Sequence, residues 1–265
     1  MTRVIVVASG KGGVGKTTLA ANLGIALALH GEDVVTLDLD LSMANLELIL
    51  GLEGKPVTLQ DVLAGNDIIS NAIYEGPGGV RIVPAGLSIH GLKNMRIERL
   101  EEVLATLVED TDILLIDAPG GLERDAIAAL NVAEELILVT TPEITSLSDA
   151  LKTKIVADKI GINILGVVIN KGQTHDAFLT PDEVEAILNL PIISIIPEDL
   201  ELNKASASGN SLLINNPDSN TSRLIMNLAA VIIGKYDYQN DLTSAGVVTK
   251  FFHTVFGKYL NVYRS

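Results

Sequence analysis

The sequence contains no cysteine, and this absence removes several kinds of site at once. Without thiols the chain forms no disulfide, no thiolate zinc site and no cysteine-ligated iron–sulfur cluster. Long apolar runs are missing too, because no uninterrupted run approaches the roughly 18 to 20 residues of a membrane-spanning helix. The opening residues, MTRVIVVASG, hold an apolar run too short for a secretory signal. We therefore expect a protein that is made and kept in the cytoplasm.

Basic residues are scarce, with 19 Lys and Arg against 33 Asp and Glu, which gives a formal net charge of -14. This balance argues against a nucleic-acid partner and leaves only a local basic patch open. The charge is also uneven along the chain. All 33 acidic residues lie at or before Asp241, and the last 24 residues carry three basic residues and no acid. Five of the nine aromatic residues lie in the same tail, which therefore differs in composition from the body.

The remaining composition, 48% hydrophobic and 20% charged over 265 residues, suits one sizeable globular domain. Short apolar runs rich in β-branched residues recur between helical stretches, at residues 4–8, 34–38, 80–84, 112–117, 135–140, 164–170 and 192–196. Such runs are typical of strands buried on both faces, with the helices as crossovers of a parallel sheet. We predict an α/β fold with a doubly wound, mostly parallel sheet and helices on both faces.

Helices are expected at residues 17–30, 96–109, 147–160, 181–188 and 221–235. One of them has a clear start, because Thr180 supplies a capping hydroxyl and Pro181 occupies the first helical position. The polar, small residues of DYQNDLTSAG interrupt the pattern near the end of the chain. We therefore expect a domain over 1–236, a linker over 237–246 and a terminal helix over 247–265.

The stretch SGKGGVGKTT lies between a predicted strand and a predicted helix. It has the form G-x-x-x-x-G-K-[ST], in which glycines let backbone N–H groups converge on phosphates at a helix N-terminus. Lys16 is expected to reach the β and γ phosphates, and the Thr17 hydroxyl is expected to bind Mg²⁺. A second cation, Lys11, follows the first glycine and has no role in a loop of this form. The stretch predicts a nucleoside-triphosphate site.

Carboxylates end two of the predicted strands. Asp117 closes the run DILLID, where a buried carboxylate is costly unless it serves a metal or hydrogen bonds. Asp38 and Asp40 follow another strand at the edge where ligands of open parallel sheets gather. We expect Asp117 to serve Mg²⁺, and Asp40 to face the metal and orient the attacking water. A capping aspartate at 117 and a plain acidic turn at 38–40 remain the alternatives.

These motifs, with VVINK and IPEDLELNKASASGNS further along, resemble the deviant Walker A ATPases of the MinD/ParA family. The similarity runs in unbroken order over roughly residues 3–235. It implies an ATP-dependent homodimer in which Lys11 reaches the phosphates of the nucleotide held by the other subunit. Lys11, Lys16 and Asp40 would be the catalytic residues, and Thr17, Asp40 and Asp117 would serve Mg²⁺.

The resemblance also implies which residues contact ATP or ADP. The phosphate loop would comprise Gly12, Gly13, Val14, Gly15, Lys16, Thr17 and Thr18, with Thr18 near the α phosphate. Asn170 falls on the adenine-contacting position, and Pro197, Glu198 and Asp199 fall on the loop that closes over the base.

Two positions depart from the family pattern. Gly120 stands where the run after the Walker B aspartate commonly has alanine, and a second glycine there would loosen the segment. Ser42 stands where bacterial members often have glycine. Neither departure affects the expectation of ATP binding.

The tail, residues 247–265, has the pattern of an interfacial helix. On a helical projection its apolar and aromatic residues gather on one arc, namely Val248, Phe251, Phe252, Val255, Phe256, Tyr259, Val262 and Tyr263. Lys250, Arg264 and polar residues lie opposite, and each basic residue near an anionic leaflet contributes on the order of 1 kcal/mol. Two tails in a dimer would bind much more tightly than one. The alternative is a helix that packs on its own body.

The leading hypothesis is a slow, partner-stimulated ATPase that binds the inner face of the cell membrane reversibly and peripherally. Its task would be septum site determination in cell division, or the placement of another cellular assembly, with an activator or cargo protein as partner. One alternative is a ParA-like DNA-partitioning ATPase, which the acidic body disfavours. Another is a regulator of flagellar or chemoreceptor placement that binds neither membrane nor DNA.

Overall fold

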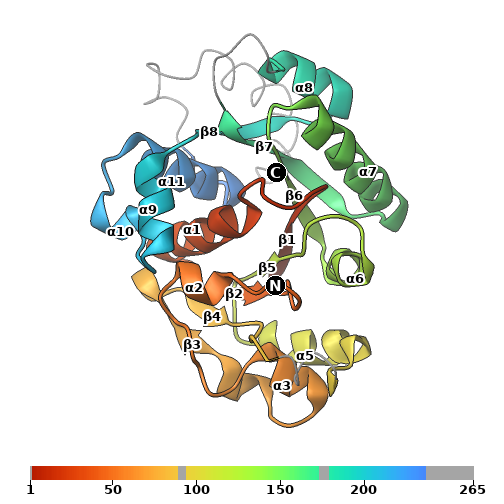
Figure 1. The fold of residues 1–265 in the computed structure, drawn as a ribbon, viewed down its shortest axis with the longest axis vertical. Coiled ribbons are helices and arrows are strands. Elements are labelled where there is room, and N and C mark those ends of the chain that lie inside the picture. Colours follow the sequence, from red (N-terminus) through yellow and green to blue (C-terminus); the bar gives the residue numbers. More distant parts are fainter. Residues whose placement is uncertain (1, 89–93, 173–178, 237–265) are drawn as a thin grey trace, which may run out of the picture.

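The structure is a computed structural model that describes residues 2–88, 94–172 and 179–236. Its centre is an eight-stranded sheet in the order β3-β4-β2-β5-β1-β6-β7-β8 (Figure 1). The strands are β1 (Arg3–Ser9), β2 (Val34–Asp38), β3 (Tyr74–Glu75), β4 (Arg81–Val83), β5 (Ile113–Asp117), β6 (Glu135–Thr140), β7 (Asn163–Gly172) and β8 (Ile192–Pro197). Every pair is parallel except β3 with β4. The predicted mostly parallel sheet is confirmed.

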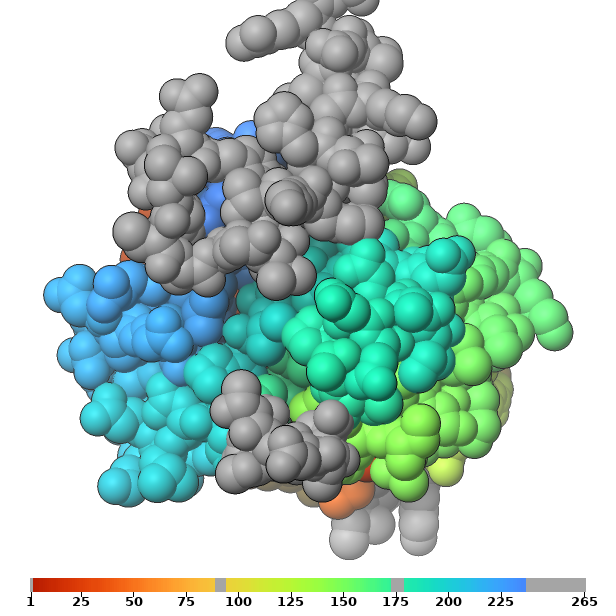
Figure 2. Space-filling model, turned by 90° about the horizontal axis from the view of Figure 1, so that it is seen from above, coloured from red at the N-terminus to blue at the C-terminus, as the bar shows by residue number. Residues whose placement is uncertain are grey.

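Helices cover both faces of this sheet (Figure 1). They are α1 (Lys16–Leu29), α2 (Leu46–Ile49), α3 (Leu59–Ala64), α5 (Leu100–Leu107), α6 (Arg124–Val132), α7 (Ile144–Ile160), α8 (Pro181–Leu188), α9 (Leu200–Ala207), α10 (Leu212–Asn215) and α11 (Asn220–Ile232). Single 3₁₀ turns occur at Ile69–Ala72, Pro77–Gly79 and Ile97–Arg99. From above, α8 in teal lies beside the green α7, with the blue C-terminal helices on its other side (Figure 2).

Strand β1 shows why the strand sequences are apolar throughout rather than alternating. Its residues Ile5 and Val7 pack on the face covered by α1 and α11, whereas Val4 and Val6 pack on the face covered by α5 and α6. Successive side chains of a strand point to opposite faces, so a sheet covered on both sides needs apolar residues at every position. This arrangement fixes the carboxyl ends of the central strands at one edge, where the candidate site lies.

The seven predicted strands are all present, but the elements outside them were predicted less well. The helix expected over 96–109 begins as a 3₁₀ turn and is α-helical only over Leu100–Leu107. The short strand β3 and five helices, α2, α3, α6, α9 and α10, were not predicted. The expected start of α8 is confirmed, because the Thr180 hydroxyl accepts a hydrogen bond from the Glu183 backbone N–H.

Two of the expected segments, the linker at 237–246 and the terminal helix at 247–265, lie outside the described residues. Within the parts that are described, none of the helices combines the length and the apolarity needed to cross a bilayer.

Candidate nucleotide-binding site

The glycine-rich loop joins β1 to α1 at the carboxyl edge of the sheet. Gly13 and Gly15 adopt left-handed conformations, with φ of 81° and 86°, which glycine reaches without the strain of a side chain. Gly15 is needed for a second reason, because a Cβ atom there would overlap the side-chain amide of Asn170. The predicted loop therefore has its expected strand–loop–helix setting, and β7 packs directly against it.

Lys16 and Asp117 form a buried ion pair beneath this loop. The Lys16 Nζ atom lies 2.6 Å from Asp117 Oδ1 and 3.4 Å from the Thr17 hydroxyl. Burial raises the pKa of Asp117, and the nearby Lys16 charge opposes that rise. Asp117 is the last residue of β5 and Lys16 is the first of α1, and the pairing of β1 with β5 brings these two predicted site residues together.

The second oxygen of Asp117 indicates that a cation fits here. Within the described part of the chain, Asp117 Oδ2 is buried and has no hydrogen-bond partner. Buried polar atoms are rarely left unpaired unless a water or an ion completes them. This oxygen and the Thr17 hydroxyl are hard oxygen donors of the type that Mg²⁺ prefers, so the residues present fit that ion.

Asp38 is a fully buried carboxylate that sequence reasoning left without a separate role. It lies in register opposite Asp117 and accepts backbone N–H bonds from Asp40 at 3.0 Å, Asn45 at 3.2 Å and Leu46 at 3.1 Å. Burial, and secondly the charge of Asp117, raise the pKa of Asp38 to about 8. Asp38 therefore anchors both ends of the loop that carries Asp40.

Asp40 lies at the rim of the site rather than inside it. Its side chain is half-buried, and its Oδ1 atom accepts the Met43 backbone N–H at 3.0 Å. The charge of Asp40 adds to the factors that raise the pKa of Asp117, which places the two carboxylates in electrostatic reach of each other.

Lys11, the other lysine of the loop, binds residues at the start of α7. Its Nζ atom lies 3.1 Å from Glu143 Oε2 and 3.4 Å from the Thr145 hydroxyl, at the start of α7. The Lys11 side chain remains 33% exposed. The two lysines of the loop therefore have different surroundings, one buried with Asp117 and one at the surface.

Gly120 packs closely on this part of the loop. A Cβ atom at Gly120 would lie 2.9 Å from the backbone nitrogen of Gly12 and 3.0 Å from the carbonyl carbon of Lys11. The small size of Gly120 permits this tight contact, and the expected loosening of the segment stays a prediction. Ser42, the other position that departs from the family pattern, is exposed two residues after Asp40.

A cavity of about 240 Å³ lies beside the loop, and the residues expected to contact the adenine base line it. It is lined by Gly13, Gly15, Thr18, Asn170, Lys171, Pro197, Glu198, Asp199, Leu202 and Asn203. The Asn170 amide donates to the Val14 carbonyl at 2.7 Å, so this side chain is fixed by the phosphate loop itself. Sequence reasoning missed Lys171, Leu202 and Asn203, the last two because α9 was not predicted.

The carboxylate of Asp199 accepts hydrogen bonds from within the protein. Its Oδ1 accepts the backbone N–H groups of Glu201 and Leu202 at the start of α9, and its Oδ2 accepts the Thr221 hydroxyl at 2.6 Å. Although partial burial acts against it, these hydrogen bonds hold the pKa of Asp199 below its ordinary value. Asp199 therefore borders the cavity while its carboxylate joins α9 to α11.

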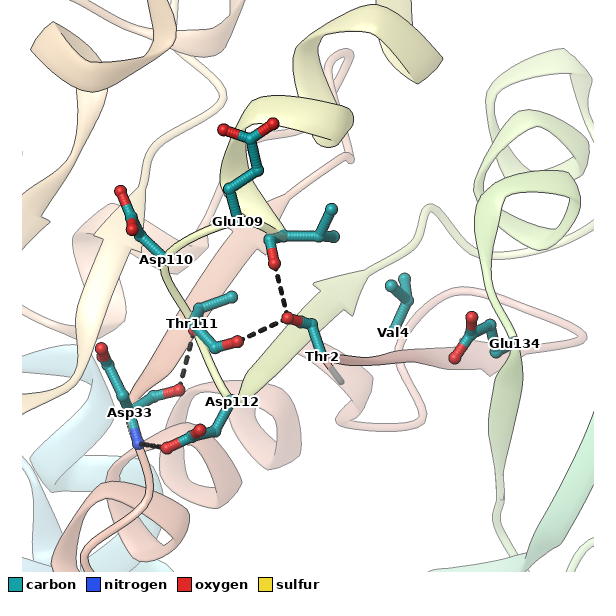
Figure 3. A pocket seen from close by; sticks show the side chains of 9 residues that line it. Thr2, Val4, Asp33, Glu109, Asp110, Thr111, Asp112 and Glu134 are labelled. Atoms are coloured by element: carbon teal, nitrogen blue, oxygen red, sulfur yellow. Dashed lines mark hydrogen bonds between the residues drawn. The ribbon is translucent and has the colours of Figure 1, made fainter.

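A larger hollow of about 810 Å³ lies at the opposite, amino-terminal edge of the sheet (Figure 3). Its carboxylates include Glu109, Asp110 and Glu134, which repel phosphates. The other polar groups bond within the protein, since the Thr111 hydroxyl donates to the Asp33 carbonyl at 2.7 Å. This hollow is therefore unsuited to a nucleotide despite its size.

A glycine loop between a parallel strand and a helix, with a buried lysine–aspartate pair and an adjacent cavity, defines a P-loop nucleotide-binding protein. The sequence profile of the CobQ/CobB/MinD/ParA nucleotide binding domain matches residues 5–213. The chain belongs to this family, which confirms the resemblance and makes the chain an ATP-binding protein and an ATPase.

Individual relatives agree with this assignment. The chain is 46% identical over 259 residues to an uncharacterized ATP-binding protein of Methanocaldococcus jannaschii, covering 97% of this chain and 98% of that one. It is 35% identical over 244 residues to the septum site-determining protein MinD of Thermotoga maritima, covering 89% of each. A solved structure of the septum site-determining protein MinD from Pyrococcus horikoshii, complexed with Mg-ADP, is similar with a TM-score of 0.84. That structure is 35% identical, and the match covers 92% of this chain and 100% of that chain.

Proposed function

We propose that this chain is an ATP-dependent dimerising switch that binds a membrane surface reversibly and so helps to place the division site or another cellular assembly. The observation that carries the proposal is the separation of the two loop lysines. Lys16 is buried beneath the loop with Asp117, whereas Lys11 pairs with Glu143 where both side chains are partly exposed. A cation in that position is available to a nucleotide held by a second copy.

Different residues of one chain bind the phosphates of ATP or ADP, hold Mg²⁺ and activate the attacking water. The N–H groups of the loop from Gly12 to Thr18 cradle the phosphates, and Lys16 exchanges Asp117 for phosphate oxygens. Thr17 and Asp117 hold the magnesium shell, and Mg²⁺ when bound neutralises the phosphate charge. Asp40 orients the attacking water and accepts its proton.

The base end of the nucleotide is assigned to the cavity beside the loop. Asn170 contacts adenine while its amide remains bonded to Val14, and Pro197 and Glu198 form the loop over the base. Asp199 supports that loop through the start of α9. The position of these residues around one cavity supports this assignment.

Exposed apolar side chains near the site support a dimer across this edge. Met43, Ile144 and Leu200 are 71%, 63% and 71% exposed, and each lies within a few residues of the carboxyl end of β2, β6 or β8. Exposed apolar groups at one edge are the kind of surface that a second protein covers. In the dimer Lys11 leaves Glu143 and reaches the partner's nucleotide, which couples ATP binding to association.

The membrane part of the proposal rests on the composition of residues 247–265, which are basic and aromatic after an acidic body. A single amphipathic helix of this type binds weakly, and two held in one dimer bind together. The test is co-sedimentation with anionic liposomes in ATP and in ADP, for the intact chain and a variant ending at Gly246. The intact chain should sediment in ATP and not in ADP, and the shortened variant should stay in solution in both.

Two other results would redirect the proposal. Equal sedimentation of the shortened variant would remove the membrane anchor and favour a regulator of placement without a lipid target. Salt-dependent DNA binding in ATP would favour a partitioning ATPase, which the acidic body opposes.

A further inference from the structure

The end of strand β7 carries an irregularity next to the phosphate loop. Asn170 pairs with Ile196 of β8 and Gly172 pairs with Pro197, so Lys171 is an extra residue inserted between two consecutive pairs. Lys171 also has a φ of 55°, in the left-handed region that side chains other than glycine rarely adopt. This combination of an inserted residue and a left-handed backbone is a β-bulge.

The bulge changes where the Lys171 side chain points. Successive residues of a regular strand face opposite sides of the sheet, so Asn170 and Lys171 could not both reach one loop without it. In the structure Asn170 Nδ2 donates to the Val14 carbonyl at 2.7 Å, and Lys171 Nζ donates to the Gly13 carbonyl at 2.9 Å. Two consecutive side chains of β7 therefore bind two consecutive carbonyls of the phosphate loop.

Within this segment only Gly13 lies at the surface, because its neighbour Val14 is buried in the core. Gly13 is exposed, has a φ of 81°, and has no heavy atom within 4 Å of the place where a Cβ would lie. A backbone strain of the kind seen at Lys171 persists only where the surrounding contacts hold it in place. The contact that Lys171 gains is the charge-assisted bond to Gly13, at the wall of the cavity that both residues line.

We propose that Lys171 is a positioning residue that controls how fast the nucleotide leaves. Its ammonium group fixes the outer part of the phosphate loop, and its aliphatic stem forms part of the wall between that loop and the base cavity. Release of the nucleotide then requires the Lys171–Gly13 bond to open. This role concerns nucleotide release within one chain, so it holds whether or not the protein dimerises or binds a membrane.

The test is the dissociation rate of a fluorescent ADP, mant-ADP, chased with excess ADP in the presence of Mg²⁺. Lys171→Gly removes the side chain and accepts the left-handed backbone without strain. Lys171→Met keeps the stem and removes the ammonium, and Lys171→Arg restores a cationic donor. The matched control is Lys235→Met. Lys235 also makes a hydrogen bond to a residue distant in sequence, Glu32 at 2.7 Å, near the other end of α1.

Loss of one charge-assisted hydrogen bond should speed release by about tenfold in Lys171→Gly and Lys171→Met. Lys171→Arg should remain within about threefold of the wild type, and Lys235→Met should release mant-ADP at the wild-type rate. The melting temperature of nucleotide-free Lys171→Gly should not fall, because the substitution relieves backbone strain. Dissociation within twofold of the wild type in both Lys171→Gly and Lys171→Met would overturn the proposal. Faster release accompanied by an equal loss of nucleotide-free stability in both would show a merely structural role and overturn it as well.

Discussion

Lys16 Nζ and Asp117 Oδ1 lie 2.6 Å apart, and their side chains are only 7% and 0% exposed. The lysine proposed to serve phosphates is therefore neutralised by the carboxylate proposed to serve the metal. A buried charge is costly unless it is paired, so each of these residues depends on the other when no nucleotide is bound. Bound nucleotide would give Lys16 a new partner and bound metal would give Asp117 one. The binding of nucleotide would thereby be coupled to the binding of metal.

Removal of one member of this pair should destabilise the nucleotide-free protein strongly. Lys16→Met leaves a buried carboxylate without its cation and should lower the free energy of unfolding by about 3 kcal/mol. Adding Asp117→Asn to Lys16→Met should recover much of that loss, as measured by urea unfolding of both single variants and the double variant. Lys152→Met is the control, because Lys152 is 64% exposed in its pair with Asp149, and it should cost below about 1 kcal/mol. Strict additivity of the two single changes would show that the buried pair is not coupled.

The buried carboxyl of Asp38 predicts an unusual dependence of stability on pH. Its pKa is raised from 3.8 to about 8, so between these values the folded chain holds a proton that the unfolded chain has lost. The free energy of unfolding should therefore fall as pH rises through this window, by at most about 1.4 kcal/mol per pH unit. Asp38→Asn should reduce the slope in urea unfolding at pH 5, 6.5 and 8. An unchanged slope in this variant would assign the dependence to other groups.

Gly120 should not tolerate even a methyl group. In Gly120→Ala the new Cβ would lie 2.9 Å from the Gly12 nitrogen, so the loop must shift, at about 1 to 3 kcal/mol. Gly12→Ala is the matched control, because a Cβ there meets nothing within 4 Å. Thermal unfolding without nucleotide should separate the two variants, with a lower melting temperature for Gly120→Ala alone. Equal melting temperatures would mean that the segment adapts to the methyl group.

Asp40 should affect chemistry far more than binding. Its side chain is half-buried at the rim and accepts one backbone bond, from Met43, so its loss should leave the nucleotide cavity intact. Asp40→Ala should lower the ATP hydrolysis rate by about 10²-fold or more, with mant-ADP affinity within a few-fold of the wild type. Ser42→Ala, an exposed change two residues away, should leave both quantities unchanged. Hydrolysis by Asp40→Ala within tenfold of the wild-type rate would exclude the proposed role.

Seven strands of the sheet could be predicted from the sequence because each is a short run rich in apolar, β-branched residues. Helix α9 could not, because half of its residues are polar and its start depends on a contact distant in sequence. Asp199 caps that helix and also binds Thr221, 22 residues further on. A sequence window contains the capping residue but not the partner that holds it.

The candidate site was predictable where each residue acts through a local motif. The phosphate loop, Asp117 and Asn170 come together as expected. Lys171 was not found, because its orientation depends on a bulge that forms only when β7 pairs with β8. Asp38 was recognised as a carboxylate but not as an anchor, since its three backbone partners are set by the fold of the following loop.

The most direct test of the dimer-controlled membrane switch is flotation of Lys11→Ala with anionic liposomes in ATP, beside the intact wild-type chain. Lys11 contacts Glu143 at the surface, so its removal should leave the fold and mant-ATP binding unchanged. The variant retains residues 247–265 and differs only in the cation assigned to the second subunit. We predict that the wild type floats in ATP and that Lys11→Ala, although it binds ATP, stays in the bottom fraction. Flotation of Lys11→Ala to the same extent as the wild type would contradict the dimer-controlled switch.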